Sequence, residues 1–240
     1  MRNTVIIIII LISSIQLPMN VLAQEQPQNE LGAWYDVAVQ YGFTDKLKYE
    51  GVYSHRLFNV VSDFQQLLWR TGLNYKLDDA HSLSAGFDLL IARSFTDDSF
   101  RSTEYRSWAH LYQTNKIGRL VWSNRFRVEQ RYIETNNEFD FDNRFRIWTV
   151  LKYPLGRKKI ESNTFYISAF NEVFVSVQEN PFSQNWVFLG LGYKFSKAIS
   201  GEVGYFNQYI NQTGFDRIRF ALGVNIPHAT KKDIATPVNE

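Results

Sequence analysis

The chain contains no cysteine. A lipid-anchored amino-terminal cysteine and a disulfide framework are therefore both excluded. Beyond residue 23, no stretch approaches the ~18 consecutive apolar residues that indicate a transmembrane helix. Helical periodicity is also missing, because no window of about a dozen residues repeats apolar positions at i, i+3, i+4 and i+7. The lack of disulfides, of a transmembrane helix and of helical periodicity favours a fold built of β-strands.

An excess of one charge is missing too. The 26 Lys and Arg residues nearly balance the 24 Asp and Glu residues, which gives a formal net charge of +2. Nucleic-acid binding needs a clustered basic excess, so we expect no nucleic-acid partner. The sequence has no G-x-S-x-G, H-E-x-x-H, P-loop or G-x-G-x-x-G motif, and its 4 histidines lack metal-ligand spacing. We therefore expect no enzyme, no cofactor and no metal site.

What the sequence has in abundance is alternation. Ile218, Phe220 and Leu222 share one parity of a run in which Arg217 and Arg219 take the other. Successive side chains of a strand point to opposite faces, so each such run has an oily face and a wet face. Eleven segments show this pattern, and many reach the ~9–11 residues that cross a bilayer. The segments are roughly 31–41, 46–56, 63–77, 80–92, 103–115, 118–133, 140–153, 163–177, 184–195, 200–210 and 215–226.

The pattern predicts an all-β fold, an antiparallel up-and-down transmembrane β-barrel of about 10–12 strands whose oily face meets lipid. Bacterial single-chain barrels have an even number of strands, so twelve strands are favoured, with ten as the second choice. Short connections alternate with longer polar ones, as expected for periplasmic turns and external loops. The longer connections are predicted at Arg93–Ser102, Glu134–Phe139 and Gln178–Ser183.

The composition of the charged parity indicates which face is inside. It carries Arg, Gly, Ser and large aromatic residues rather than the flexible Lys and Glu of a solvated surface, which favours a crowded polar lumen. Aromatic residues make up 16% of the chain. Aromatic girdles at the membrane interfaces account for such an excess, and so does a large buried core. A soluble barrel with the oily parity inside is the alternative.

Charged side chains on three consecutive segments are predicted to share one patch of the lumen wall, because sequential strands of an up-and-down barrel are neighbours. The patch consists of Glu104, Arg106, His110, Arg125, Arg127, Glu129, Arg131, Asp142, Arg144 and Arg146. The planar fork of Arg matches carboxylate or phosphate, so the patch is a candidate track for a small anionic solute. Pairing of Arg with Glu into a salt-bridged filling is the alternative, and barrel size favours it because about eight strands are just filled by their own side chains.

Residues 1–23 are typical of a secretory signal peptide. Arg2 supplies the positive charge, residues 5–12 form an apolar run, and Val21-Leu22-Ala23 has the small-residue pattern that precedes cleavage. An amino-terminal membrane anchor is the alternative, but Ser13 and later polar residues interrupt the run short of ~20 residues. We expect a signal peptide at 1–23, a short lead at 24–30, a barrel at 31–227 and a disordered polar tail at 228–240.

Six stretches spread between residues 31 and 208 carry a family resemblance. They are LGAWYD at 31–36, FQQLLWRTGLNYKL at 64–77, KIGRLVWSNRFRVEQRYIE at 116–134, DNRFRIWTVLKYPL at 142–155, FYISAFNEVFVS at 165–176 and FSQNWVFLGLGYKFSKAISGEVGYFNQ at 182–208. The most distinctive part is R-x-R-x-E-Q-R at 125–131 followed by N-R-F-R at 143–146. On these stretches the sequence resembles domain-of-unknown-function family 2490, exported proteins common in Bacteroidota. The resemblance implies an outer-membrane barrel, and it implies no activity and no functional residues.

The predicted location is the outer membrane of a Gram-negative bacterium, reached by export. Expected partners are outer-membrane lipids, the barrel-assembly machinery during biogenesis and a small anionic solute. The leading functional hypothesis is a non-enzymatic, porin-like narrow channel or a binding barrel for a small anionic or sugar-like solute. The alternatives are a lumen-filled structural barrel, a soluble periplasmic binding barrel and an outer-membrane lipid-modifying hydrolase. For the hydrolase the sequence offers only His81-Ser82 at a short turn, without a placed carboxylate or amide, so we expect a surface turn histidine there.

Overall fold

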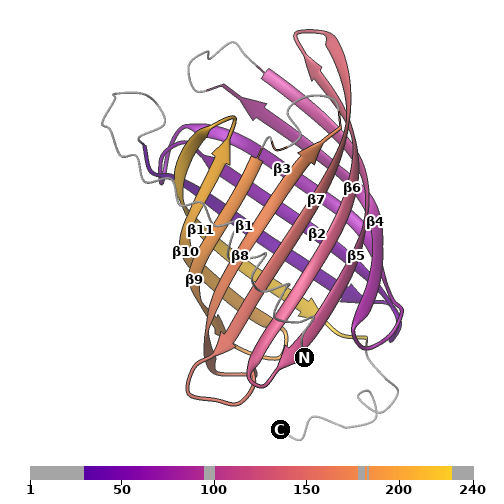
Figure 1. The fold of residues 1–240 in the computed structure, drawn as a ribbon, viewed down its shortest axis with the longest axis vertical. Helices are drawn as coiled ribbons and strands as arrows, with labels where there is room; N and C mark the ends of the chain where they lie inside the picture. Colours follow the sequence, from indigo (N-terminus) through magenta and orange to yellow (C-terminus); the bar gives the residue numbers. More distant parts are fainter. Residues whose placement is uncertain (1–29, 95–100, 178–181, 183, 229–240) are drawn as a thin grey trace, which may run out of the picture.

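The computed structural model describes residues 30–94, 101–177, 182 and 184–228 of the 240-residue chain. The predicted signal peptide, the lead up to residue 29 and the tail beyond residue 228 lie outside the described residues. Within these described residues, eleven strands form a closed barrel in which each strand pairs with its neighbours in sequence (Figure 1). The strands are β1 (Gly32–Gly42), β2 (Leu47–Leu57), β3 (Phe64–Lys76), β4 (His81–Arg93), β5 (Arg101–Ile117), β6 (Leu120–Thr135), β7 (Glu138–Pro154), β8 (Thr164–Ser176), β9 (Gln184–Lys194), β10 (Ile199–Ile210) and β11 (Thr213–Ile226).

The barrel closes through a parallel pair. β1 runs alongside β11 from Gly32 opposite Arg217 to Tyr41 opposite Ile226, whereas all other neighbouring strands of the barrel are antiparallel. The predicted all-β barrel is confirmed, but the preference for an even number of strands is wrong. With eleven strands, the first and the last must run in the same direction. We call the end where β1 begins the entry mouth and the end where β11 finishes the exit mouth.

Tight turns join several hairpins. Asn136 and Asn137 have φ of 51° and 64°, the left-handed values that a two-residue type I′ turn requires at both central positions. The prediction of a longer connection at Glu134–Phe139 is therefore wrong, because β6 and β7 continue to this turn. β5, β6 and β7 are the longest strands, with 17, 16 and 17 residues. The β6–β7 hairpin consequently rises beyond the rest of the entry mouth, at the top of Figure 1.

The two faces of the wall reverse the usual arrangement of a soluble protein. The outer face carries large exposed apolar side chains such as Phe87, Val128 and Leu189, whereas the inner face buries charged ones such as Arg127 and Glu129. Exposed apolar side chains of this number and size, over a buried charged interior, invert the rule for soluble domains. The soluble-barrel alternative required the oily parity inside, and the structure places it outside. In the part of the chain that the structure describes, no helix has the length and apolar character needed to cross a bilayer.

Candidate functional site

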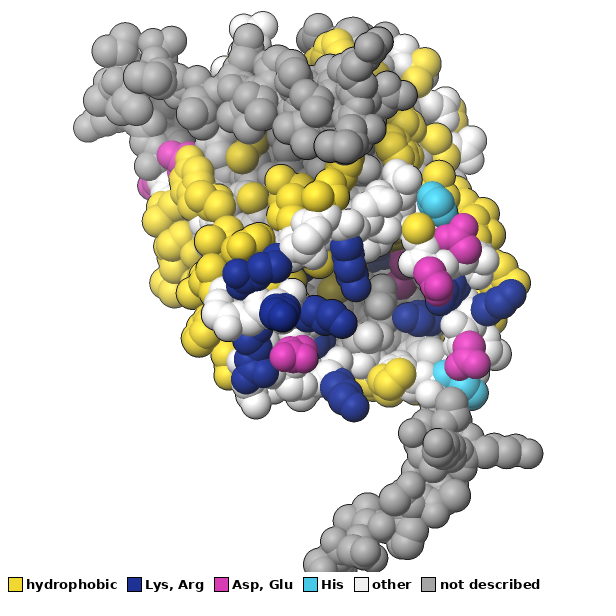
Figure 2. All heavy atoms as spheres, turned by 60° about the horizontal axis from the view of Figure 1, so that its bottom comes forward, with side chains coloured by type: hydrophobic (Ala, Val, Ile, Leu, Met, Phe, Trp, Pro, Cys, Tyr) yellow, Lys and Arg dark blue, Asp and Glu magenta, His cyan; other side chains and the backbone are white. Residues whose placement is uncertain are grey.

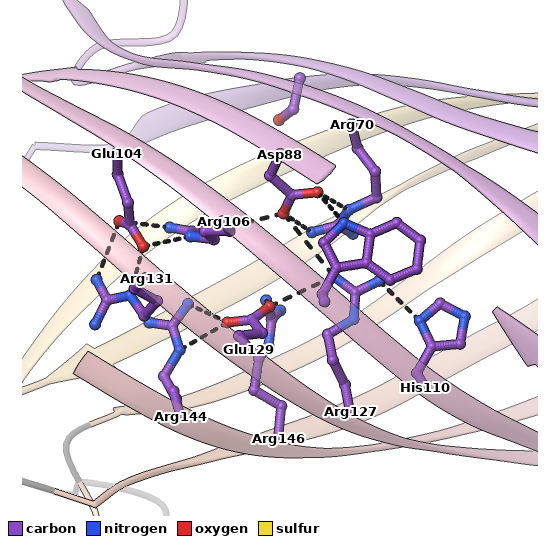
Figure 3. Close-up of polar contacts among 12 residues, drawn as sticks. Arg70, Asp88, Glu104, Arg106, His110, Arg127, Glu129, Arg131, Arg144 and Arg146 are labelled. Atoms are coloured by element: carbon purple, nitrogen blue, oxygen red, sulfur yellow. Dashed lines mark hydrogen bonds and ion pairs between the residues drawn. The ribbon is translucent and has the colours of Figure 1, made fainter. Parts of the chain in front are cut away.

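The lumen between β3 and β7 contains the predicted charged patch. Alternate residues of each strand point inward, so charges spaced two apart in the sequence face the same cavity. The register then sets Asp88 opposite Arg106, Arg127 opposite Arg146, and Glu129 opposite Arg144. All ten residues predicted for the patch lie on this side of the wall, and one network of contacts joins them, with Arg125 linked through Glu172. Figure 3 shows the part of the network around Glu104, Asp88 and Glu129.

Glu129 is the centre of this network. Its Oε2 accepts hydrogen bonds from Nε and Nη2 of Arg144 at 2.9 and 2.6 Å, and its Oε1 accepts one from Nη1 of Arg146 at 2.7 Å. Arg127 adds a longer contact to Oε1 at 3.4 Å. Charge-assisted bonds to a carboxylate are among the strongest polar contacts in proteins, so this arrangement fixes the relative positions of β6 and β7.

Asp88 is a second centre of the ion-pair network, although it is not one of the ten residues predicted for the patch. Arg70 donates to both carboxylate oxygens, from Nε at 2.7 Å and from Nη2 at 2.6 Å, and the indole of Trp108 donates at 2.6 Å. Arg106 lies 3.7 Å away. The alternation of the sequence could have identified this pair, because Arg70 and Asp88 fall on the inward parity of neighbouring segments that pair directly.

Further carboxylates link the remaining arginines. Glu104 binds Arg106 through Nη2 at 2.8 Å and also accepts from Arg131, which reaches Asp142 at 2.8 Å. Glu172 on β8, likewise outside the predicted patch, accepts from Arg125 at 2.6 Å and from Arg146 at 2.8 Å.

His110 sits at the edge of the network. Its Nδ1 lies 3.1 Å from Arg127 Nη2, and its Nε2 is 3.5 Å from a carboxylate oxygen of Glu50. The ring stacks on Trp108 with centroids 4.9 Å apart. His110 therefore connects the arginine network to Glu50 on β2, which the sequence reading missed.

The opposite wall of the lumen is aromatic. Trp34, Phe188 and Phe206 form a buried cluster against which Phe170 and Trp186 pack. Arginines of adjacent strands contact this wall. The guanidinium carbon of Arg146 lies 4.4 Å from the centroid of Phe174, its cross-strand partner, and that of Arg56 lies 3.7 Å from its partner Trp34. Cation–π contacts of this kind are strongest where water is excluded.

The two walls meet and close the lumen at mid-height. Arg127 is 1% exposed, Glu129 is 2% exposed and Phe206 is 0% exposed. These side chains leave almost no surface within reach of water. Among the described residues, the charged patch is packed at this level as a network of buried ion pairs.

The exit mouth is hollow and basic. Figure 2 looks onto this end and shows Lys and Arg side chains around the opening. Lys152 projects inward and pairs with Glu202, which also accepts a bond from the Tyr166 hydroxyl at 3.0 Å. Lys48 and Lys194 also lie on inward positions, and among the described residues neither has a carboxylate within ion-pair distance.

The turn between β3 and β4 explains His81. Asp78 Oδ1 accepts from the backbone N–H of Ala80 at 2.7 Å and of His81 at 2.8 Å, and His81 Nδ1 lies 3.0 Å away. These donors, led by the amide of Ala80, lower the pKa of Asp78. Ser82 instead accepts a bond from Asn74 at 3.0 Å on the lumen side. His81 is thus part of a turn cap, and neighbouring residues of a strand, such as His81 and Ser82, point to opposite faces. Within the described ranges, no three His, Asp or Glu side chains gather as a metal site.

Comparisons with known proteins add a family and one structural likeness. A family model described as "Protein of unknown function (DUF2490)" matches residues 31–219. No curated protein sequence matches the chain. Among solved structures, the NanC porin matches with a TM-score of 0.49 and 14% sequence identity, over 81% of this chain and 98% of the porin chain.

Proposed function

The chain belongs to the DUF2490 family of proteins of unknown function, and we propose that it is an outer-membrane β-barrel with a closed lumen, which acts as a non-enzymatic binding barrel for a small anionic solute. The observation that carries the proposal is the reversal of polarity across the wall, with exposed apolar side chains outside and buried ion pairs inside. A bilayer is the solvent in which that arrangement is stable.

Two features of the wall support a membrane setting. Closure of the barrel satisfies the backbone groups of every strand, because no edge strand is left unpaired in hydrocarbon. The strands have 11 to 17 residues, enough to cross the bilayer at the usual tilt. The short turns at the exit mouth favour the periplasmic side for that end, and the long β6–β7 hairpin favours the external side for the entry mouth.

The closed lumen favours binding over free diffusion. Open aqueous channels occur in barrels of roughly 16–18 strands, whereas small barrels are filled by their side chains. Here the filling is arginine-rich, and the exit mouth adds lysines without carboxylate partners among the described residues. Such fixed positive charge attracts small anions.

Fractionation of the mature protein tests the proposal. We expect recovery in the outer membrane, dependence on detergent for extraction, and faster gel migration of the unheated sample than of the boiled one. Recovery in the osmotic-shock fraction as a soluble protein would overturn the membrane assignment. Turnover of labelled phospholipid or lipopolysaccharide by the purified barrel would overturn the non-enzymatic assignment and favour the hydrolase.

A further inference from the structure

Two buried arginines of the lumen differ from all the others. Arg56 and Arg217 are 7% and 1% exposed, yet within the described part of the chain neither has a carboxylate within ion-pair distance. Arg56 donates to the hydroxyl of Ser54 at 3.1 Å and to the side-chain oxygen of Gln66. Among the described residues, Arg217 donates to backbone carbonyls alone, those of Glu30 at 3.2 Å and Asp216 at 3.0 Å.

The nearest acidic side chains are already engaged. Asp36, two residues from the partner of Arg56 on the neighbouring β1, binds Arg219 at 2.6 Å. The carboxylate of Asp216 binds the hydroxyl of Tyr205 and the side-chain amide of Asn207. Burying a cation without a counter-ion costs desolvation free energy, so a negatively charged partner would stabilise the two guanidinium groups.

Arg56 and Arg217 lie near the entry mouth on β2 and β11, the two strands that flank β1, and Arg56 contacts the indole of Trp34. Trp34 lies opposite Arg56 across β1 and β2, and Gly32 lies opposite Arg217 across β1 and β11. Gly32 allows this packing, because a Cβ there would lie 2.6 Å from Cδ of Arg217. The rings of Trp34 and Trp186 are 5.0 Å apart, and the guanidinium of Arg56 also lies 5.6 Å from Trp186.

The unused polar atoms of this cluster are mainly donors. Nε1 of Trp34, Nε1 of Trp186 and Nε of Arg217 are buried without a hydrogen-bond partner, and so is the acceptor Oε1 of the neighbouring Gln208. Buried polar groups are nearly always satisfied in native proteins. Free indole N–H groups beside Arg56, with the free Nε of Arg217 on the other side of β1, have the chemistry that an oxyanion satisfies, because an oxyanion accepts several hydrogen bonds and carries the missing charge.

We propose that Arg56, Arg217 and the indole N–H groups of Trp34 and Trp186 form an oxyanion site at the entry mouth, which binds a carboxylate or phosphate group of a small solute. The aromatic faces of the same cluster would contact the apolar part of that solute. The site deepens the proposed binding function of the lumen, but it does not depend on whether the outer face meets lipid.

Binding to the purified full-length mature barrel in detergent tests the site. The probes are glucuronate, glucose 6-phosphate and glucose, which share a ring and differ in the charged group, at constant ionic strength. We expect a saturable rise of the thermal midpoint and a saturable change of tryptophan fluorescence with at least one of the two anions, and neither change with glucose. The anion that binds more tightly identifies carboxylate or phosphate as the preferred group. No saturable response to either anion, or an equal response to glucose, would overturn the proposal.

Variants separate binding from structure. Arg217→Met should weaken anion binding about tenfold or more, and it should also raise the thermal midpoint of the ligand-free barrel, because it removes an uncompensated buried charge. Trp34→Phe keeps a ring but removes one donor, so weaker binding by a folded barrel is expected even where Arg217→Met does not fold. Lys158→Gln, in the exposed exit-mouth loop, is the matched control for net charge and should bind as the parent does. If Arg217→Met lowers the ligand-free midpoint and both variants keep the parent's affinity, the cluster is structural and the site is disproved. Fractionation remains a separate readout, so failure of the membrane assignment would not be mistaken for failure of this site.

Discussion

Glu129 on β6 accepts both Nε and Nη2 of Arg144 on β7 at a single oxygen, with distances of 2.9 and 2.6 Å. The two residues face each other directly in the strand register. Their contact is therefore a cross-strand pair that a one-residue slip would destroy, since a slip moves every side chain to the other face. In a wall whose outer face is mainly apolar, such inward pairs specify the register of neighbouring strands.

Removing the Glu129 charge should strongly destabilise the barrel. Glu129→Gln leaves Arg144 and Arg146 buried without this shared carboxylate, and loss of one partner from a buried ionic pair costs about 3–5 kcal/mol. The free energy of unfolding, measured with denaturant in lipid vesicles, checks this. Glu161→Gln is the control, because it breaks the exposed pair with Arg157 and should cost about 1 kcal/mol or less. Equal losses in the two variants would contradict the central role of Glu129.

The wild-type barrel should carry no steady ionic current in a planar bilayer, because its lumen is closed at mid-height. Arg144→Gln should lower the thermal midpoint without creating an anion-selective current. A wild-type current whose anion preference disappears in Arg144→Gln would show instead that the charged patch lines a channel.

A charge on the outer face should oppose membrane insertion. Leu189 is 59% exposed at the centre of β9, and Arg at the bilayer midplane of a barrel costs about 2–4 kcal/mol. Leu189→Arg should therefore reduce both the stability in vesicles and the amount recovered in the membrane. Leu77→Arg, in a turn at the exit mouth, should cost about 0–1 kcal/mol because the penalty falls toward the interfaces. Similar behaviour of the two variants would argue against a lipid-facing wall.

Gly86 should not tolerate even alanine. A Cβ at this position would lie 2.1 Å from the carbonyl oxygen of Thr71 and 2.6 Å from Cα of Gly72, both backbone atoms that cannot rotate away. Gly86→Ala should fail to give the fast-migrating folded band on an unheated gel. Gly214→Ala is the matched control, since its Cβ would meet only the side chain of Asn207 at 3.5 Å. A normal folded band for Gly86→Ala would show that β3 and β4 can separate.

Asp78 should make the β3–β4 turn sensitive to acid. Its pKa is lowered in the folded protein by the amides of Ala80 and His81 and by the His81 side chain. A lowered folded pKa means that the stabilisation is complete above the ordinary carboxyl range and is lost as pH falls through the folded pKa. The thermal midpoint of the parent should thus exceed that of Asp78→Asn at neutral pH, and the difference should vanish in strong acid. A difference independent of pH would assign the effect to turn geometry rather than to charge.

Alternation made most of the wall predictable. The inward parity of residues 125–131 and 142–146 follows from period two alone, whereas the register that joins them is set by the two-residue turn that the sequence did not predict. The same rule could have added Arg70 and Asp88, which occupy inward positions on adjacent segments. The Asn136-Asn137 turn was harder, because asparagine suits both a two-residue turn and a longer polar loop.

Closure and the aromatic wall depend on contacts between distant parts of the chain. Trp34 meets Trp186 and Phe206 only after the barrel closes, and no local pattern encodes that meeting. The sequence also does not reveal that Arg56 and Arg217 have no carboxylate partner among the described residues, because this depends on which acidic residues form ion pairs with the other arginines. The even-number rule failed for a related reason, because pairing of β1 with β11 is settled by three-dimensional closure.

The parallel seam between β1 and β11 has a topological consequence. With an odd number of strands, Gly32 and Ile226 lie at opposite ends of the barrel. In the setting proposed above, Gly32 would face the cell surface and Ile226 the periplasm. The first and the last strand would thus cross the membrane in the same direction, side by side.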